Sequence, residues 1–134
     1  MSFIGLASCR QDNVTETKVL DLGEFRLTVP NDWRAFPLQG IDSQVGGVTN
    51  GRDSLLYDYG WYSYRLDQET SATHRRTKLK IDKRPALLVR PRQQGQGVVG
   101  VYVEVGGPTK FGMTGRNLRE EDEAIQIIKS VNFD

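Results

Sequence analysis

Few side chains in this sequence belong to the types that catalyse reactions, and they lie far apart along the chain. Cys9 is the only cysteine and His74 is the only histidine. A cysteine–histidine pair needs both groups side by side, and a histidine metal centre needs several such ligands. The sequence therefore predicts no catalytic pair, no metal site and no bound cofactor, and it predicts that His74 lies in an exposed loop.

Two aspartates remain as candidates for acid–base chemistry. Asp42 follows Gly40, and Asp58 opens the densest aromatic segment, residues 58–64. Paired carboxylates catalyse glycoside hydrolysis, so a small hydrolase using Asp42 and Asp58 is one hypothesis. Aromatic rings beside a carboxylate also line sugar and peptide sites. The candidate ligand site consists of Asp42, Asp58, Tyr59, Trp61 and Tyr62. The same rings are equally suited to a hydrophobic core.

Basic residues dominate positions 75–92, where Asp82 is the only acid. Such a run suits an anionic partner, for example a phospholipid head group or a polysaccharide. The candidate basic patch consists of Arg75, Arg76, Lys78 and Lys80. No aromatic residue is interleaved with these side chains for base stacking, so a nucleic-acid partner is not expected. The alternative is a solvated sheet face whose charges prevent aggregation.

The elements that must position these residues are mostly strands. Apolar and polar residues alternate over 24–29, 76–82 and 99–105, and period two is typical of half-buried strands. Residues 54–59 are also strand-like, and the apolar run 86–89 suits a central strand. The glycine-rich stretch from Pro37 to Asn50 is predicted as a loop.

One helix is predicted, close to the C-terminus. Asn117 and Glu120 fit an N-cap with a glutamate three residues later, and Ala124, Ile127 and Ile128 follow at helical spacing. Gly95–Gly100 matches G-x-G-x-x-G, but it leads into a valine-rich strand rather than a helix. We therefore predict a hairpin loop there and not a dinucleotide site.

Length and composition predict one folded domain. The chain has 134 residues, of which 37% are hydrophobic and 26% charged, with a net charge of +1. This size suits a single core, and the near-neutral charge argues against a protein built to coat nucleic acid. No window approaches the roughly 20 apolar residues that a transmembrane helix requires. Strands followed by a helix predict an α+β fold, with a mostly antiparallel sheet and a C-terminal amphipathic helix packed on it.

The N-terminal segment ends at the only cysteine. Leu6-Ala7-Ser8-Cys9 resembles the lipobox of bacterial lipoproteins, in which the cysteine is diacylated and becomes the mature N-terminus. The resemblance implies lipidation of Cys9. A signal also needs a basic region and a longer apolar stretch before this motif, so residues 1–9 are interpreted as a signal remnant. Residues 10–22 are predicted to form a flexible tether and residues 23–134 the domain.

Two further segments resemble PsbP-like α/β/α-sandwich proteins. These are Phe25 to Trp33, with its Val-Pro-x-x-Trp strand ending, and Ile127 to Phe133. The stretches 40–46 and 58–63 resemble small uncharacterised bacterial lipoproteins. PsbP-like domains mostly assist or bind other proteins rather than catalyse, so the resemblance implies an accessory role.

Together these observations predict a membrane-tethered, non-enzymatic accessory or binding domain on the periplasmic or extracellular face of a bacterium. Its expected partner is a protein or a glycan, and no nucleic acid is expected. The alternatives are the small hydrolase and a cytosolic protein-interaction module without lipid. The sequence leaves the oligomeric state open.

Overall fold

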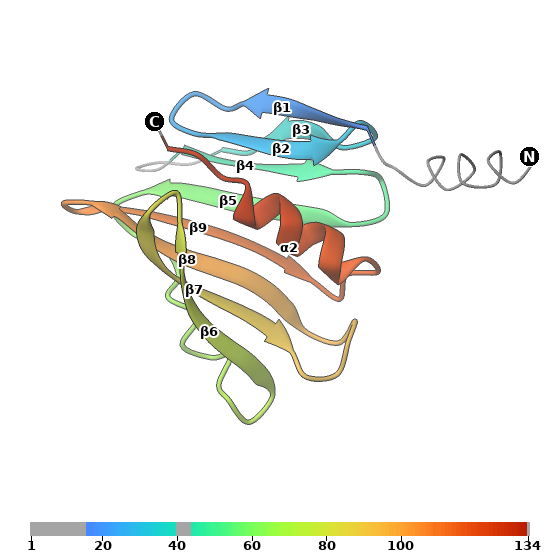
Figure 1. Ribbon diagram of the computed structural model, residues 1–134, viewed down its shortest axis with the longest axis vertical. Coiled ribbons are helices and arrows are strands. Elements are labelled where there is room, and N and C mark those ends of the chain that lie inside the picture. The colour runs from blue at the N-terminus through green and yellow to red at the C-terminus, as the bar shows by residue number, and fades with distance from the viewer. Residues whose placement is uncertain (1–15, 40–43, 134) are drawn as a thin grey trace, which may run out of the picture.

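A computed structural model describes residues 16–39 and 44–133 of the chain (Figure 1). Cys9 and Asp42, which the sequence singles out, lie outside the described residues. The described part consists of nine strands and the helix α2 (Glu121–Lys129). The strands are β1 (Thr17–Asp21), β2 (Arg26–Pro30), β3 (Arg34–Pro37), β4 (Gln44–Thr49), β5 (Ser54–Gly60), β6 (His74–Ile81), β7 (Arg84–Pro91), β8 (Val98–Gly106) and β9 (Thr109–Arg116).

Seven strands form one antiparallel sheet in the order β3-β4-β5-β9-β8-β7-β6, and β1 and β2 form a separate hairpin. The sheet is built from two meanders, β3–β4–β5 and β6–β7–β8–β9, which join where β5 pairs with β9. The segment 61–73 therefore has to carry the chain from β5, inside the sheet, to β6 at its far edge. The connection between β7 and β8 is a hairpin, as the glycine pattern at 95–100 predicts.

Helix α2 and the β1–β2 hairpin cover one face of the sheet (Figure 1). The buried side of α2 carries Ala124, Ile127 and Ile128, which confirms the predicted apolar stripe. The carboxyl end of α2 is tied to β2 because the Thr28 amide donates to Ser130 Oγ at 2.8 Å. Trp33 is fully buried under this layer, and its Nε1 donates to Glu123 Oε2 at 2.6 Å. The fold is therefore a mostly antiparallel α+β domain with its C-terminal helix packed on the sheet.

Residues 17–21, expected in the flexible tether, instead form β1. Every residue of β1 pairs with a residue of β2, from Thr17 opposite Pro30 to Asp21 opposite Arg26. This strand cannot be recognised in the sequence, because its residues are mostly exposed and show no regular apolar alternation. Its partner β2 provides the buried side chains instead, with Leu27 and Val29 in the core.

The predicted start of the helix is wrong. Helix α2 begins at Glu121, and Asn117 has a positive φ of 54° and binds the Gly97 amide through Oδ1 at 2.7 Å. The free amides at this end are bound by Asp53, whose carboxylate accepts from the backbone N–H groups of Arg119 and Glu120 at 2.8 and 2.9 Å. Asp53 therefore fixes the two residues that lead into α2, and no local pattern reveals this contact because Asp53 lies 66 residues before Arg119.

The prediction of a loop from Pro37 to Asn50 is also wrong, because β4 lies within it. Its glycines are strand residues that leave room for aromatic rings. A Cβ atom at Gly46 would lie 2.5 Å from Tyr57 Oη, and one at Gly47 would overlap the Phe36 ring. Strand β9 also contains glycines and was not predicted. Glycine in a strand interior therefore marks close packing here rather than a loop.

No described helix is long and apolar enough to cross a bilayer.

Candidate functional site

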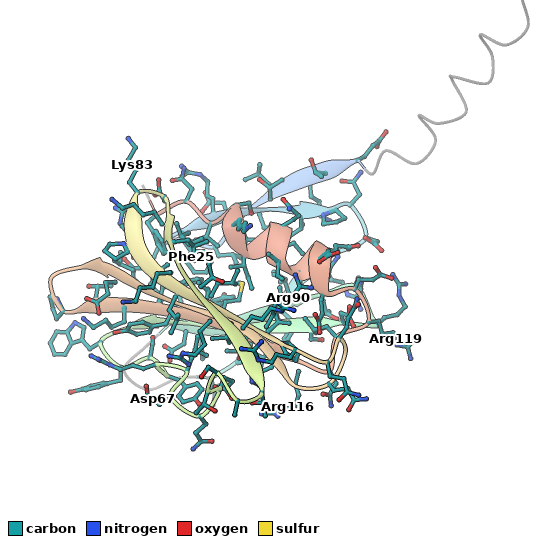
Figure 2. All side chains as sticks on the ribbon, turned by 60° about the horizontal axis from the view of Figure 1, so that its bottom comes forward. Phe25, Asp67, Lys83, Arg90, Arg116 and Arg119 are labelled. Atoms are coloured by element: carbon teal, nitrogen blue, oxygen red, sulfur yellow. The ribbon has the colours of Figure 1, made fainter. Side chains whose placement is uncertain are left out.

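The sheet face turned away from α2, which we call the outer face, carries the side chains that the sequence analysis places in water. Along β6, Leu79 and Ile81 pack toward the core under α2, so Arg76, Lys78 and Lys80 point to the outer face. Figure 2 shows Asp67, in segment 61–73, on the side of the sheet opposite α2. The outer face is therefore covered partly by a loop, whereas the other face is covered by α2 and β1–β2.

Segment 61–73 is pinned to the outer face. Leu66 is fully buried in a small cluster with Tyr102, and its backbone has a positive φ of 64°. Arg76 Nη1 donates to the carbonyl oxygens of Leu66 and Glu69 at 2.8 and 2.6 Å. A bulky residue with a positive φ is strained, so these bonds and the burial of Leu66 hold the segment in place.

Beside this segment, β6, β7 and β8 form an open groove of about 470 Å³. This basic groove is lined by Arg76, Lys78, Leu79, Lys80, Pro85, Ala86, Leu87, Tyr102 and Glu104. Strand register gives it a simple order: Leu87 lies opposite Lys78 on one side and opposite Tyr102 on the other. The cationic side chains therefore border an apolar floor.

The two lysines of the basic groove are not neutralised. Lys78 and Lys80 lie opposite Leu87 and Pro85 across the β6–β7 pair, and neither forms an ion pair within the described part of the chain. The one groove carboxylate, Glu104, lies on β8 and is 3.8 Å from Lys110 Nζ. The β6 side of the groove is therefore cationic and open to an anionic partner.

The Tyr102 side chain contacts two charged residues, Glu104 and Arg65. Partial removal from water, followed by the charge of Glu104, raises the pKa of Tyr102 above its usual value of 10.0. The hydroxyl donates to Glu104 Oε2 at 3.3 Å, and Arg65 lies over the ring at 5.5 Å. Tyr102 thus stays a neutral hydrogen-bond donor, and its ring forms part of the groove floor.

Strand β6 is also an edge strand, because β7 is its only neighbour among the strands that the structure describes. Every second residue of this eight-residue strand therefore presents its backbone N–H and C=O groups on the side away from β7. Such an edge accepts an additional strand, and the lysines next to it oppose pairing with uncharged or basic strands.

The other basic residues of the run have different positions. Arg75 lies opposite Arg90 on the α2 side of the sheet, apart from the other three members of the predicted patch. Arg90 Nη2 is 3.1 Å from Glu121 and 3.0 Å from Asp122, and Figure 2 shows it close to α2. Arg84 is 2.8 Å from Asp82. These three arginines do not line the groove. The site for an anionic partner therefore contains fewer basic residues than the run in the sequence.

The structure divides the predicted aromatic ligand site between two faces. Tyr59 packs on the α2 side, where its ring stacks 6.2 Å from Phe25, and Asp58 points to the outer face. Trp61 and Tyr62 follow the strand and are 61% and 73% exposed. Strand alternation therefore separates Asp58 from Tyr59, whereas Trp61 and Tyr62 remain on the surface.

The prediction for His74 is wrong. It begins β6, lies opposite Pro91 and is only 7% exposed, with Nδ1 2.8 Å from Thr73 Oγ1. The turn at Gly97 lies against the other ring nitrogen and covers the side chain. Within residues 16–39 and 44–133, no group of histidine and acidic side chains is arranged to hold a metal ion.

Comparison with solved structures finds a likeness in fold. No family model matches the chain, and no curated protein matches it. A crystal structure of a protein from Bacteroides thetaiotaomicron, at 1.50 Å resolution, is similar with a TM-score of 0.50 and 12% sequence identity. The match covers 90% of this chain and 48% of that one, so the chain spans about half the length of that protein. At this identity, the likeness to a bacterial protein shows the fold alone.

Proposed function

We propose that this protein is a non-enzymatic binding domain, held at a bacterial membrane by lipid on Cys9, that captures an extended acidic segment of a partner protein. The segment would add to the free edge of β6 and place its carboxylates over the basic groove. The observation that carries the proposal is that Lys78 and Lys80, which have no ion-pair partner in the described residues, lie along an open edge strand above an apolar floor.

Strand addition fits the chemistry of this edge. Side chains of an added strand alternate between the two faces of the sheet. Every second side chain would lie beside Arg76, Lys78 and Lys80, where a carboxylate is favourable. The side chains between them would lie beside Thr77 and Leu79, where an apolar residue is favourable. A partner segment with alternating acidic and apolar residues therefore satisfies both faces.

The position of the groove suits a partner away from the anchoring bilayer. The β1–β2 hairpin lies at the β3 end of the sheet, and β6 lies at the opposite edge (Figure 1). Six strand spacings of about 4.8 Å separate β3 from β6, which is about 29 Å. A domain held through the residues before β1 would present the basic groove outward. The resemblance to PsbP-like proteins supports the same accessory role.

The test uses a peptide of alternating glutamate and valine, with eight residues and blocked ends, titrated into the isotope-labelled protein. We expect the amide signals of β6 and of the groove to shift on binding, and the affinity to fall as salt is added. The double variant K78E/K80E should bind at least tenfold more weakly. A peptide of alternating lysine and valine should not bind.

Arg75→Glu is the matched control, because it reverses a charge on the same strand but on the other face. If Arg75→Glu weakens binding as much as K78E/K80E, the effect reflects net charge and the proposal is wrong. The proposal is equally wrong if the acidic peptide shifts no amide signal of β6.

A glycan is the second candidate partner, because Trp61 and Tyr62 are the most exposed large aromatic side chains near the outer face. Exposed rings of this kind stack on sugars and also contact proteins. Co-sedimentation with insoluble bacterial cell-wall polysaccharide, for wild type and W61A, separates these cases. Loss of sedimentation in W61A favours the glycan, and equal sedimentation argues against it.

A further inference from the structure

A second hollow of about 470 Å³ lies on the outer face, at the start of β5 and the end of β9. The residues that matter in this arginine pocket are Arg52, Ser54, Leu56, Thr114, Arg116 and Asn117. It shares no lining residue with the basic groove. Figure 2 shows Arg116 at the surface on the side of the sheet where Asp67 lies.

The floor of the arginine pocket is part of a row of four residues across the sheet. Side chains cover both ends of this row but not its middle. Across the sheet, Gly47, Leu56, Thr114 and Gly100 lie side by side. Leu66 covers Gly100, since a Cβ atom there would lie 3.2 Å from Leu66 Cδ2, and the Phe36 ring covers Gly47. Leu56, on an interior strand between them, is 46% exposed. Leu56 is therefore an exposed apolar side chain whose neighbours on both adjoining sides of the row are covered. A small apolar group could lie on Leu56 in the same way.

The charged and amide side chains that line this pocket mainly offer hydrogen-bond donors. The Arg116 side chain has no hydrogen bond or ion pair with any described residue, and Arg52 is 3.8 Å from Asp32, with both of these side chains more than half exposed. The one lining carboxylate, Asp53, is occupied by two backbone amides at 2.8 and 2.9 Å. Asn117 Oδ1 is bound to the Gly97 amide, which leaves its NH₂ group to donate.

We propose that the arginine pocket binds a small organic anion, with its acidic group at Arg116 and Arg52 and its apolar body on Leu56. Guanidinium groups hold carboxylate, sulfonate and phosphate oxygens by paired, charge-assisted hydrogen bonds. The apolar contact requires a body of a few carbon atoms, and the volume admits one or two fused rings. A bare inorganic anion would leave Leu56 exposed and is therefore expected to bind more weakly.

The probe for this test is 8-anilinonaphthalene-1-sulfonate, and its matched control is N-phenyl-1-naphthylamine, which has the same ring body without the sulfonate. We expect the sulfonate to bind one site with enhanced fluorescence and to shift the amide signals of residues 54–56 and 114–118. Arg116→Gln should weaken binding at least tenfold, and Leu56→Ser severalfold. Both positions are exposed, so both variants are expected to keep the wild-type circular dichroism spectrum.

The control variants are Arg75→Gln, which removes the same charge elsewhere, and K78E/K80E, which alters the basic groove. Neither should change binding of the sulfonate. The proposal for the arginine pocket can therefore be wrong while the proposal for the basic groove holds, and the reverse. The proposal is overturned if Arg75→Gln weakens binding as much as Arg116→Gln. It is also overturned if the uncharged naphthylamine binds as tightly as the sulfonate, or if inorganic sulfate competes at concentrations as low as those of the probe.

Discussion

One arginine nitrogen connects α2 to the sheet through two carboxylates in different surroundings. Arg90 Nη2 is 3.1 Å from Glu121 Oε1 and 3.0 Å from Asp122 Oδ1, but the Glu121 side chain is 1% exposed and that of Asp122 is 85% exposed. The second Glu121 oxygen accepts from the Gly95 amide at 2.7 Å. Glu121 therefore joins β7, the β7–β8 turn and the start of α2, whereas Asp122 lies in water.

Glu121→Gln should destabilise the protein by about 2 kcal/mol, because an amide keeps the shape but cannot accept hydrogen bonds from both partners. Asp122→Asn is the matched control, and it should cost less than about 1 kcal/mol because the exposed pair is screened by water. Urea unfolding of the two variants and the wild type provides the free energies of unfolding. Equal losses for both variants would show that burial of Glu121 does not set the strength of this contact.

The hydroxyl of Tyr64 ties segment 61–73 to itself and responds to pH. It donates to Glu69 Oε1 at 2.7 Å and accepts from the Gln68 amide at 2.9 Å. Partial removal from water, and then the hydrogen bond to Glu69, raise the pKa of Tyr64 above its usual value of 10.0. An acid whose pKa is higher in the folded state stabilises that state below its unfolded pKa and loses this contribution as the pH rises through the folded pKa.

The difference in unfolding free energy between wild type and Tyr64→Phe should therefore be constant up to about pH 10, the ordinary tyrosine pKa, and shrink above it. Urea unfolding from pH 8 to 11 measures this difference. Tyr62→Phe, which alters a 73% exposed neighbour, controls for the loss of a phenol. A difference that does not change with pH would contradict the raised pKa of Tyr64 in the folded protein.

At the scale of elements, the edge strand β6 depends on its lysines to remain unpaired. Strand β6 is eight residues long, and β7 is its only described neighbour. In an antiparallel pairing of two β6 edges, the row of Arg76, Lys78 and Lys80 would face a second basic row. Like charges directly opposite destabilise such pairing, so this edge is protected against a second copy but open to an acidic strand.

Replacing both lysines by threonine should therefore cause self-association, because threonine favours strands and carries no charge. We expect K78T/K80T to form dimers or larger species at concentrations where the wild type does not, as sedimentation velocity will show. Arg75→Thr, on the other face of the same strand, should leave the sedimentation unchanged. If K78T/K80T sediments like the wild type, the lysines are not needed to protect the edge.

Most elements that the sequence predicted correctly share one property, which is an apolar row that alternates or follows helical spacing, and β7 was predicted from a continuous apolar run. Strands β2, β5, β6 and β8 and the apolar side of α2 belong to this class. The strands that it missed hide their pattern. Strands β4 and β9 contain glycines where rings or backbone pack closely, and β1 is exposed. The helix start was missed because Asp53, which binds the amides of the two residues before α2, lies 66 residues before Arg119.

The candidate site was predictable only in part. The sequence shows which residue types are present, but it does not show on which face of the sheet each side chain lies. The basic run of β6 stands out, but only register shows that Arg75 and Arg90 face α2 while Lys78 borders Leu87. The sequence does not reveal the arginine pocket, since Arg52 precedes β5 and Arg116 ends β9, far apart along the chain. Only the pairing of β5 with β9 brings their neighbourhoods together.

The proposed lipid tether would determine where the two proposed binding surfaces lie relative to the membrane. The lipobox resemblance at Leu6–Cys9 predicts that Cys9 carries a diacylglycerol group. A single fatty chain holds a protein only marginally, whereas two chains, at about 0.8 kcal/mol for each buried methylene, hold it stably. Cys9 is eight residues before Thr17, the first residue of β1, and eight residues span at most about 29 Å. The domain would therefore remain close to the membrane.

The native protein should partition into the membrane fraction, and mass spectrometry of its N-terminal peptide should find acyl groups on Cys9. Cys9→Ser removes the thiol that carries the lipid, so this variant should move to the aqueous phase in a detergent phase separation. Cys9 lies outside the domain. The loss of peptide affinity in K78E/K80E relative to wild type should therefore be the same for the lipidated and the unlipidated protein. An unmodified Cys9 in a protein that partitions with the aqueous phase would contradict the tether but leave the basic groove as a binding site, since its lysines and edge strand do not depend on the anchor.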